Sequence, residues 1–151
     1  MKATSKAKLH YLRVVFPLLV ILLLVACGDR IIVYKGTCAH QTRQFLDYIH
    51  SLVVDELTPV IEDGFKSGPT TDVMKRIDEV DTRISKINTP EWNTKTQAVK
   101  DALRQYVLET RNYFSTVAGR SVYGEGAVQG QFSEMSEAGW AFEIAFDDLR
   151  R

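Results

Sequence analysis

The chain has 151 residues, with 19 lysines and arginines against 19 aspartates and glutamates. The first 26 residues hold four of the basic side chains and none of the acidic ones, so residues 27–151 carry 15 basic against 19 acidic side chains, a formal charge of −4. A mildly acidic segment has no electrostatic reason to bind nucleic acid, which we exclude as a partner. Its 125 residues are enough for one domain with a hydrophobic core.

The N-terminus has the three zones of a secretion signal. Residues 1–13 contain all four of the basic side chains, and residues 14–26 are apolar apart from Pro17. An apolar run of about 13 residues is typical of a signal peptide and is shorter than the roughly 20 residues of a membrane-spanning helix. The pattern predicts a signal peptide over 1–26, and the alternative is an uncleaved membrane anchor with an incidental cysteine.

The signal ends in a short motif, Leu24-Val25-Ala26-Cys27. This motif resembles the lipobox of bacterial lipoproteins, in which leucine, a tolerant position and a small residue precede the cysteine. The resemblance covers about the first fifth of the chain. It implies that the Cys27 thiol receives a diacylglycerol, that the signal is cut just before it, and that the new amine is often acylated with a fatty acid such as palmitate. The protein would then be anchored to a membrane and would face the periplasm.

A tether over residues 27–37 is expected to follow the cut. In enteric-type bacteria an aspartate directly after the lipidated cysteine retains lipoproteins at the inner membrane. Here Gly28 holds that position and Asp29 comes one residue later, which favours the outer membrane. The tether contains an unusual apolar stretch, Ile31 to Tyr34, which could rest at the lipid interface, pack on one end of the domain or form a short strand.

Residues 38–151 have the apolar spacing of amphipathic helices. A first helix is predicted over 39–65, kinked or broken at Leu57–Thr58 because Pro59 removes a backbone hydrogen bond and clashes with the preceding turn. The second helix begins after Thr70 or Thr71. Its apolar residues recur at steps of four and three: Val73, Ile77, Val80, Ile84 and Ile87.

Two more helices complete the expected domain. The segment Asn88-Thr89-Pro90-Glu91 predicts a third helix with Thr89 as N-cap and Pro90 at its first position. Residues 119–130 contain four glycines and predict a flexible connection. The fourth helix follows, with Gly139 on its apolar face. Four such segments predict an all-α fold, an up-down four-helix bundle. The order of these segments over 70–150 is loosely similar to uncharacterised helical-bundle lipoproteins of bacteria, a resemblance that implies no activity.

No motif in the helical part indicates catalysis, a metal or a cofactor. His40 and His50 are ten residues apart, so they point about 80° apart on a helix and cannot share a metal ion. Asp47 and His50 favour a surface pair over a catalytic dyad. We therefore expect a protein that is not an enzyme and has no cofactor or metal. Cys38, left without a partner once Cys27 is lipidated, is expected to be a partly buried side chain at a helix start.

Two aromatic residues are candidates for contact with a partner. Trp140 lies off the apolar face of the fourth helix, and Tyr123 lies in the glycine-rich connection. The leading hypothesis is a lipid-anchored periplasmic protein that acts as a non-enzymatic accessory or interaction protein of the cell envelope, with an envelope protein as its partner. The alternative is a bundle that binds a small molecule or haem in the aromatic-lined space between the last two helices.

Overall fold

The computed structural model describes residues 36–90 and 93–151, all within the compact unit Ile32–Arg151. The described residues form helices and no strands. The signal peptide, Cys27 and the stretch Ile31 to Tyr34 lie outside them. The helices are α2 (Cys38–Ser51), η1 (Leu52–Leu57), α3 (Thr58–Ser67), α4 (Thr71–Ser85), α5 (Thr94–Ala118), α6 (Arg120–Tyr123) and α7 (Glu125–Arg150).

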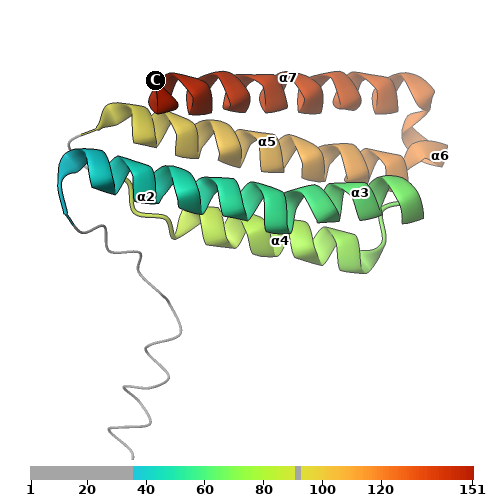
Figure 1. The fold of residues 1–151 in the computed structure, drawn as a ribbon. Coiled ribbons are helices and arrows are strands. Elements are labelled where there is room, and N and C mark those ends of the chain that lie inside the picture. Colours follow the sequence, from blue (N-terminus) through green and yellow to red (C-terminus); the bar gives the residue numbers. More distant parts are fainter. Residues whose placement is uncertain (1–35, 91–92) are drawn as a thin grey trace, which may run out of the picture. The chain divides into compact units, whose positions relative to one another are not determined.

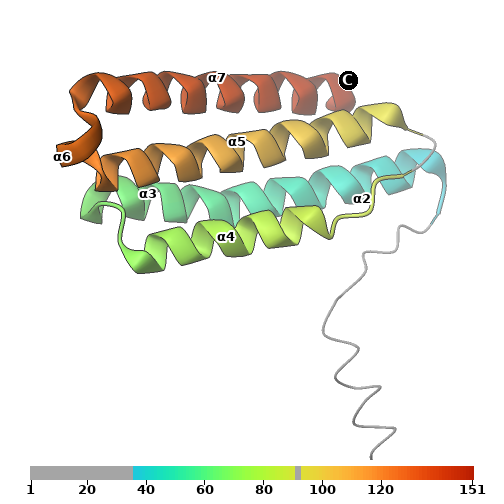
Figure 2. The same ribbon diagram turned by 180° about the vertical axis from the view of Figure 1, so that it is seen from behind.

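The long helices run alternately up and down, which confirms the predicted all-α bundle. The segments α2, η1 and α3 continue one another as the first helix, α4 returns beside it, α5 follows, and α7 lies along α5 (Figures 1 and 2). The start of α2 and the end of α7 therefore lie at the same end of the bundle (Figures 1 and 2). This arrangement brings the start of α2 and the end of α7, which are about a hundred residues apart in the sequence, to the same end of the bundle.

The first helix absorbs Pro59 without breaking. A π-helical turn, η1, ends just before the proline, and the Thr58 amide donates to the carbonyl of Val53, five residues back. In a regular α-helix, Pro59 would leave the carbonyl of Asp55 without a donor and press its ring against it. The wider turn accommodates the ring at the expected place, so the disturbance is a π-bulge within a continuous helix.

The buried face of α4 matches the predicted spacing. Val73, Ile77, Val80 and Ile84 are buried on α4, and Ile87 is buried just after it. The hydroxyl of Thr70 accepts a hydrogen bond from the Val73 amide at 3.2 Å, which identifies Thr70 as the N-cap. The core continues into both neighbours, where the buried residues include Phe45, Ile49, Leu57, Val99, Leu103 and Phe114.

The predicted start of the third helix is wrong. α5 begins at Thr94, and Asn93 is its N-cap, with its side-chain oxygen accepting from the Lys95 amide at 3.0 Å. The carbonyl of Pro90 accepts from the Asn93 amide, so the proline opens a turn and is not the first residue of the helix. The hydroxyl of buried Thr96 lies 2.5 Å from the Asn93 carbonyl and 3.5 Å from the Pro90 carbonyl, so it ties the first turn of α5 to the turn that Pro90 opens.

The glycine-rich segment is also more ordered than the sequence predicted. Residues 120–123 form α6, and α7 already begins at Glu125, so Gly126 and Gly130 lie inside a helix. Gly124 has a φ of +81°, the left-handed conformation that favours glycine, and it separates the two helices. The turn is therefore tight, and a salt bridge between Arg120 and Glu125 spans it.

Two glycines allow neighbouring helices to approach closely. A Cβ on Gly139 of α7 would lie 3.2 Å from the Tyr106 ring of α5, so α7 and α5 approach each other closely at this glycine. A Cβ on buried Gly64 of α3 would lie 2.4 Å from the Phe114 ring of α5. Both contacts join α5 to its neighbours, which makes α5 the central helix of the bundle.

Candidate functional site

The two predicted contact residues are both exposed, at different places. Tyr123 ends α6 and is 64% exposed, whereas Trp140 lies in the middle of α7 and is 70% exposed. Trp140 comes fifteen positions after Glu125, the first residue of α7, which is roughly 22 Å of helix at 1.5 Å per residue. The structure therefore does not bring Tyr123 and Trp140 into one site.

Trp140 forms a patch with a residue that the sequence did not single out. Ile144 is four residues further along α7 and is 66% exposed, so the two side chains are neighbours on the outer face of the helix. Three acidic residues, Glu137, Glu143 and Asp147, lie three positions before or after one of them and border it. We call these five residues the Trp140 patch.

The acidic border of the Trp140 patch has no cationic partner within the described part of the chain. Glu137 accepts a hydrogen bond from the Ser133 hydroxyl, and no lysine or arginine among residues 36–90 and 93–151 forms a salt bridge with Glu137, Glu143 or Asp147. Burial raises the pKa of Tyr106 on the neighbouring helix α5, and the negative charge of Glu143 adds to this rise. The patch thus has an apolar centre, Trp140 and Ile144, and the three acidic side chains around it form no salt bridge within the described residues.

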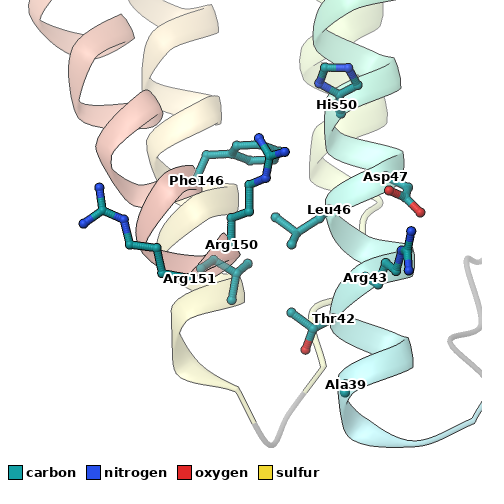
Figure 3. Close-up of a pocket in the computed structure, with 10 residues that line it drawn as sticks. Ala39, Thr42, Arg43, Leu46, Asp47, His50, Phe146, Arg150 and Arg151 are labelled. Atoms are coloured by element: carbon teal, nitrogen blue, oxygen red, sulfur yellow. The ribbon is translucent and has the colours of Figure 1, made fainter.

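A second surface feature is a cleft between α2 and α7, at the end of the bundle where α2 begins (Figure 3). Its volume is about 630 Å³, and it is open to solvent. Figure 3 shows Leu46 and Phe146 pointing toward each other across it, with Arg150 beside Phe146. The lining residues are Ala39, Thr42, Arg43, Leu46, Asp47, His50, Phe146, Leu149, Arg150 and Arg151.

The cleft contains a histidine, a carboxylate and a hydroxyl, which are His50, Asp47 and Thr42, but they do not form a catalytic arrangement. Thr42 and His50 are eight residues apart on one helix, or roughly 12 Å along its axis. The Thr42 hydroxyl donates to the carbonyl of Cys38 at 3.1 Å. A nucleophile and its base must lie within hydrogen-bond distance, about 2.6–3.2 Å in a competent geometry. Thr42 and His50 are too far apart for that role.

The described residues contain no group of three or more histidine, cysteine, aspartate or glutamate side chains that could hold a metal ion. Within the same residues, no helix is long and apolar enough to cross a membrane. Cys38 begins α2 as expected but is exposed, so the prediction of partial burial is wrong. The predicted lipidation site, Cys27 with Leu24, Val25 and Ala26, lies outside the described residues.

The space between the last two helices is filled by protein side chains. Met135, Ala138 and Phe142 of α7 are buried, and Tyr106 of α5 packs over Gly139. The aromatic residues that drew attention in the sequence therefore serve mainly to join α5 and α7. Open space lies instead between α2 and α7, which sequence spacing within single helices could not reveal.

Comparison with known proteins assigns no function to the Trp140 patch or to the cleft. The chain matches no protein-family model, no curated protein sequence and no solved structure.

Proposed function

We propose that this protein is a lipid-anchored, non-enzymatic interaction protein of a bacterial cell envelope, which binds a partner protein through the Trp140 patch. The observation that carries the proposal is the patch itself, in which an exposed tryptophan and an exposed isoleucine share one face of α7. Tryptophan is among the residues that contribute most to protein interfaces when a partner covers it. A large exposed aromatic side chain beside an exposed isoleucine thus favours a contact surface.

The acidic border indicates the chemistry of the partner. Glu137, Glu143 and Asp147 place formal negative charges around the tryptophan, and none of the three forms a salt bridge with a lysine or arginine of the described residues. A basic surface would meet this charge, and an arginine or lysine over the indole ring would add a cation–π contact of about 0.5–2 kcal/mol. The expected partner is therefore a protein with a basic surface and a small apolar recess for Trp140.

The anchor rests on the lipobox resemblance at Leu24, Val25, Ala26 and Cys27. Cys38, where α2 begins, comes eleven positions after Cys27. At 3.3–3.6 Å per residue such a tether spans at most about 40 Å, so the start of α2 would stay within that distance of the lipid surface. The partner would then be a protein of the same membrane or of the adjacent periplasm, with the outer membrane favoured by Gly28.

The Trp140 patch can be tested in cells by photo-crosslinking. A photoreactive amino acid placed at Ile144 should form adducts with a basic envelope protein. The same amino acid at Leu108 of α5, which is also exposed, is the matched control and should not form them. Adding Trp140→Ala or Glu137→Lys should reduce the Ile144 adducts at least tenfold. Equal adducts from both positions, or adducts that Trp140→Ala leaves unchanged, would overturn the assignment of the patch.

A further inference from the structure

The cleft between α2 and α7 differs from the Trp140 patch in both shape and charge. Three apolar side chains form its floor: Leu46 from α2, and Phe146 and Leu149 from α7. Its volume of about 630 Å³ falls within the 300–1,000 Å³ that is usual for small-molecule sites. An apolar floor that is open at one side suits a flexible hydrocarbon chain better than a flat, rigid ring.

The arginines of the cleft are distinguished by having no partner among the described residues. Five arginines elsewhere in the described part form salt bridges with carboxylates: Arg76, Arg83, Arg104, Arg111 and Arg120. The other three arginines of that part are Arg43, Arg150 and Arg151, none of which forms one, and all three line the cleft. Unpaired guanidinium groups are therefore concentrated at one place on the bundle.

Figure 3 shows which of these charges reaches the apolar floor. Arg150 lies between the helices beside Phe146, whereas Arg43 lies beside Asp47 on the side of α2 away from α7, and Arg151 extends from α7 away from α2. Asp47 is the opposing side chain in the lining, so the lining side chains alone, three arginines and one aspartate, sum to a formal charge of +2 when His50 is counted as neutral. Guanidinium groups bind phosphate and carboxylate through paired, charge-assisted hydrogen bonds.

From this combination we propose that the cleft binds an anionic amphiphile, with the alkyl chain on Leu46, Phe146 and Leu149 and a phosphate or carboxylate headgroup at Arg150 and its neighbours. The ligand class is a single acyl or alkyl chain that carries one acidic headgroup. A membrane phospholipid and a free fatty acid or lysolipid share this chemistry. The cleft lies beside the start of α2, the end of the bundle that the tether to Cys27 would hold near lipid, although the cleft itself does not depend on the anchor.

The test uses full-length protein purified in a non-ionic detergent, with native mass spectrometry to count bound ligand. The probes are dodecyl phosphate, the zwitterionic dodecyl phosphocholine, hexyl phosphate and inorganic phosphate. Dodecyl phosphate should bind at least tenfold more tightly than each of the other three, because it alone supplies both the anionic headgroup and the long chain. Equal binding of dodecyl phosphocholine would overturn the role of the arginines, and equal binding of inorganic phosphate would overturn the role of the floor.

Two variants locate the site. The double substitution Arg150→Gln with Arg151→Gln should weaken dodecyl phosphate binding at least tenfold, since each charge-assisted contact contributes about a factor of ten or more. Arg104→Gln, which removes an exposed arginine of α5 that pairs with Asp81, is the matched control and should bind as the wild type does. Circular dichroism should show that both variants remain folded, because the three side chains lie at the surface. Loss of binding in the control, or none in the double variant, would place the ligand elsewhere.

A competition arm distinguishes the two sources of ligand. Vesicles of phosphatidylglycerol should displace dodecyl phosphate if the headgroup of a membrane lipid enters the cleft, whereas vesicles of phosphatidylcholine should not. If neither displaces it, the ligand is a free single-chain amphiphile. Both results retain the proposed chemistry, and displacement by phosphatidylcholine to the same extent would contradict it. Failure of this site would leave the Trp140 patch untouched, because the two surfaces share no residue.

Discussion

Gly64→Ala is the most informative single substitution in the bundle, because it tests the packing of the first helix on α5. A Cβ at Gly64 would lie 2.4, 2.7 and 2.9 Å from three ring carbons of Phe114. Ordinary carbon contacts are at about 3.5–4.0 Å, so either the ring or the helix must move by roughly 1 Å. Phe114 cannot move freely, since it is 1% exposed and packs against Phe65 and Tyr113 with ring centroids 5.5 and 5.2 Å away.

Two opposing effects set the magnitude for Gly64→Ala. Overpacking of a core costs about 1–3 kcal/mol, whereas replacing glycine by alanine inside a helix contributes up to about 1 kcal/mol. We expect a net loss of about 1–2 kcal/mol in the free energy of unfolding. For a bundle of this size the melting temperature should fall by roughly 4–8 °C, measured by circular dichroism in detergent.

The control is a glycine with open space around it. Gly130 lies inside α7, and a Cβ there would meet nothing within 4 Å. Gly130→Ala should therefore stabilise the protein by up to about 1 kcal/mol, through helix propensity alone. Phe114→Leu in the Gly64→Ala background should recover part of the lost stability, because it removes the ring that the new methyl group meets. An equal rise in melting temperature for both alanine variants would refute the packing of α3 on α5.

Three further predictions concern single side chains. Burial and the charge of Glu143 raise the pKa of Tyr106 above its ordinary value near 10, so the stability that Tyr106 contributes is fully present below pH 10 and is lost as the pH rises through its folded pKa. Glu143→Gln should lower the pKa of Tyr106 in an ultraviolet titration. An unchanged titration would contradict the stated role of Glu143. Thr96→Val should cost about 1 kcal/mol, measured by chemical denaturation, because it removes the buried hydrogen bond to the Asn93 carbonyl, and an unchanged midpoint would argue against that bond. Trp140→Ala should change the melting temperature by less than about 2 °C, since the side chain is exposed, and a larger fall would mean that Trp140 is part of the core.

The spacing of apolar residues predicted most of the fold, because burial on one face leaves a direct periodic trace. Val73, Ile77, Val80 and Ile84 show this for α4, where a single neighbouring core selects one face. α5 was harder to interpret. It packs on α4 with one side and on α7 with another, so buried Val107 and Phe114 and the tyrosines that meet α7 occupy different faces.

Local patterns predicted the start of α4 at Thr70 or Thr71, but they did not predict the start of α5 or the cleft. Pro90 can equally open a helix or a turn. The helix begins after Asn93 instead, because the Asn93 side chain caps α5 and the Thr96 hydroxyl bonds to the preceding backbone. Among the surface features, the exposure of Trp140 could be predicted from its position off the apolar face of its helix. The cleft could not be predicted, because Leu46 and Phe146 are a hundred residues apart in the sequence and meet only when the whole bundle folds.

The lipid anchor at Cys27 is the claim on which the proposed location and the choice of envelope partners depend. Its most direct test is the intact mass of the protein extracted from membranes, measured for the wild type beside Cys27→Ala. We predict a wild-type chain that begins at Cys27 and carries added acyl mass, and a Cys27→Ala protein that lacks this mass. A wild-type chain that still contains residues 1–26 and carries no acyl group would contradict the account.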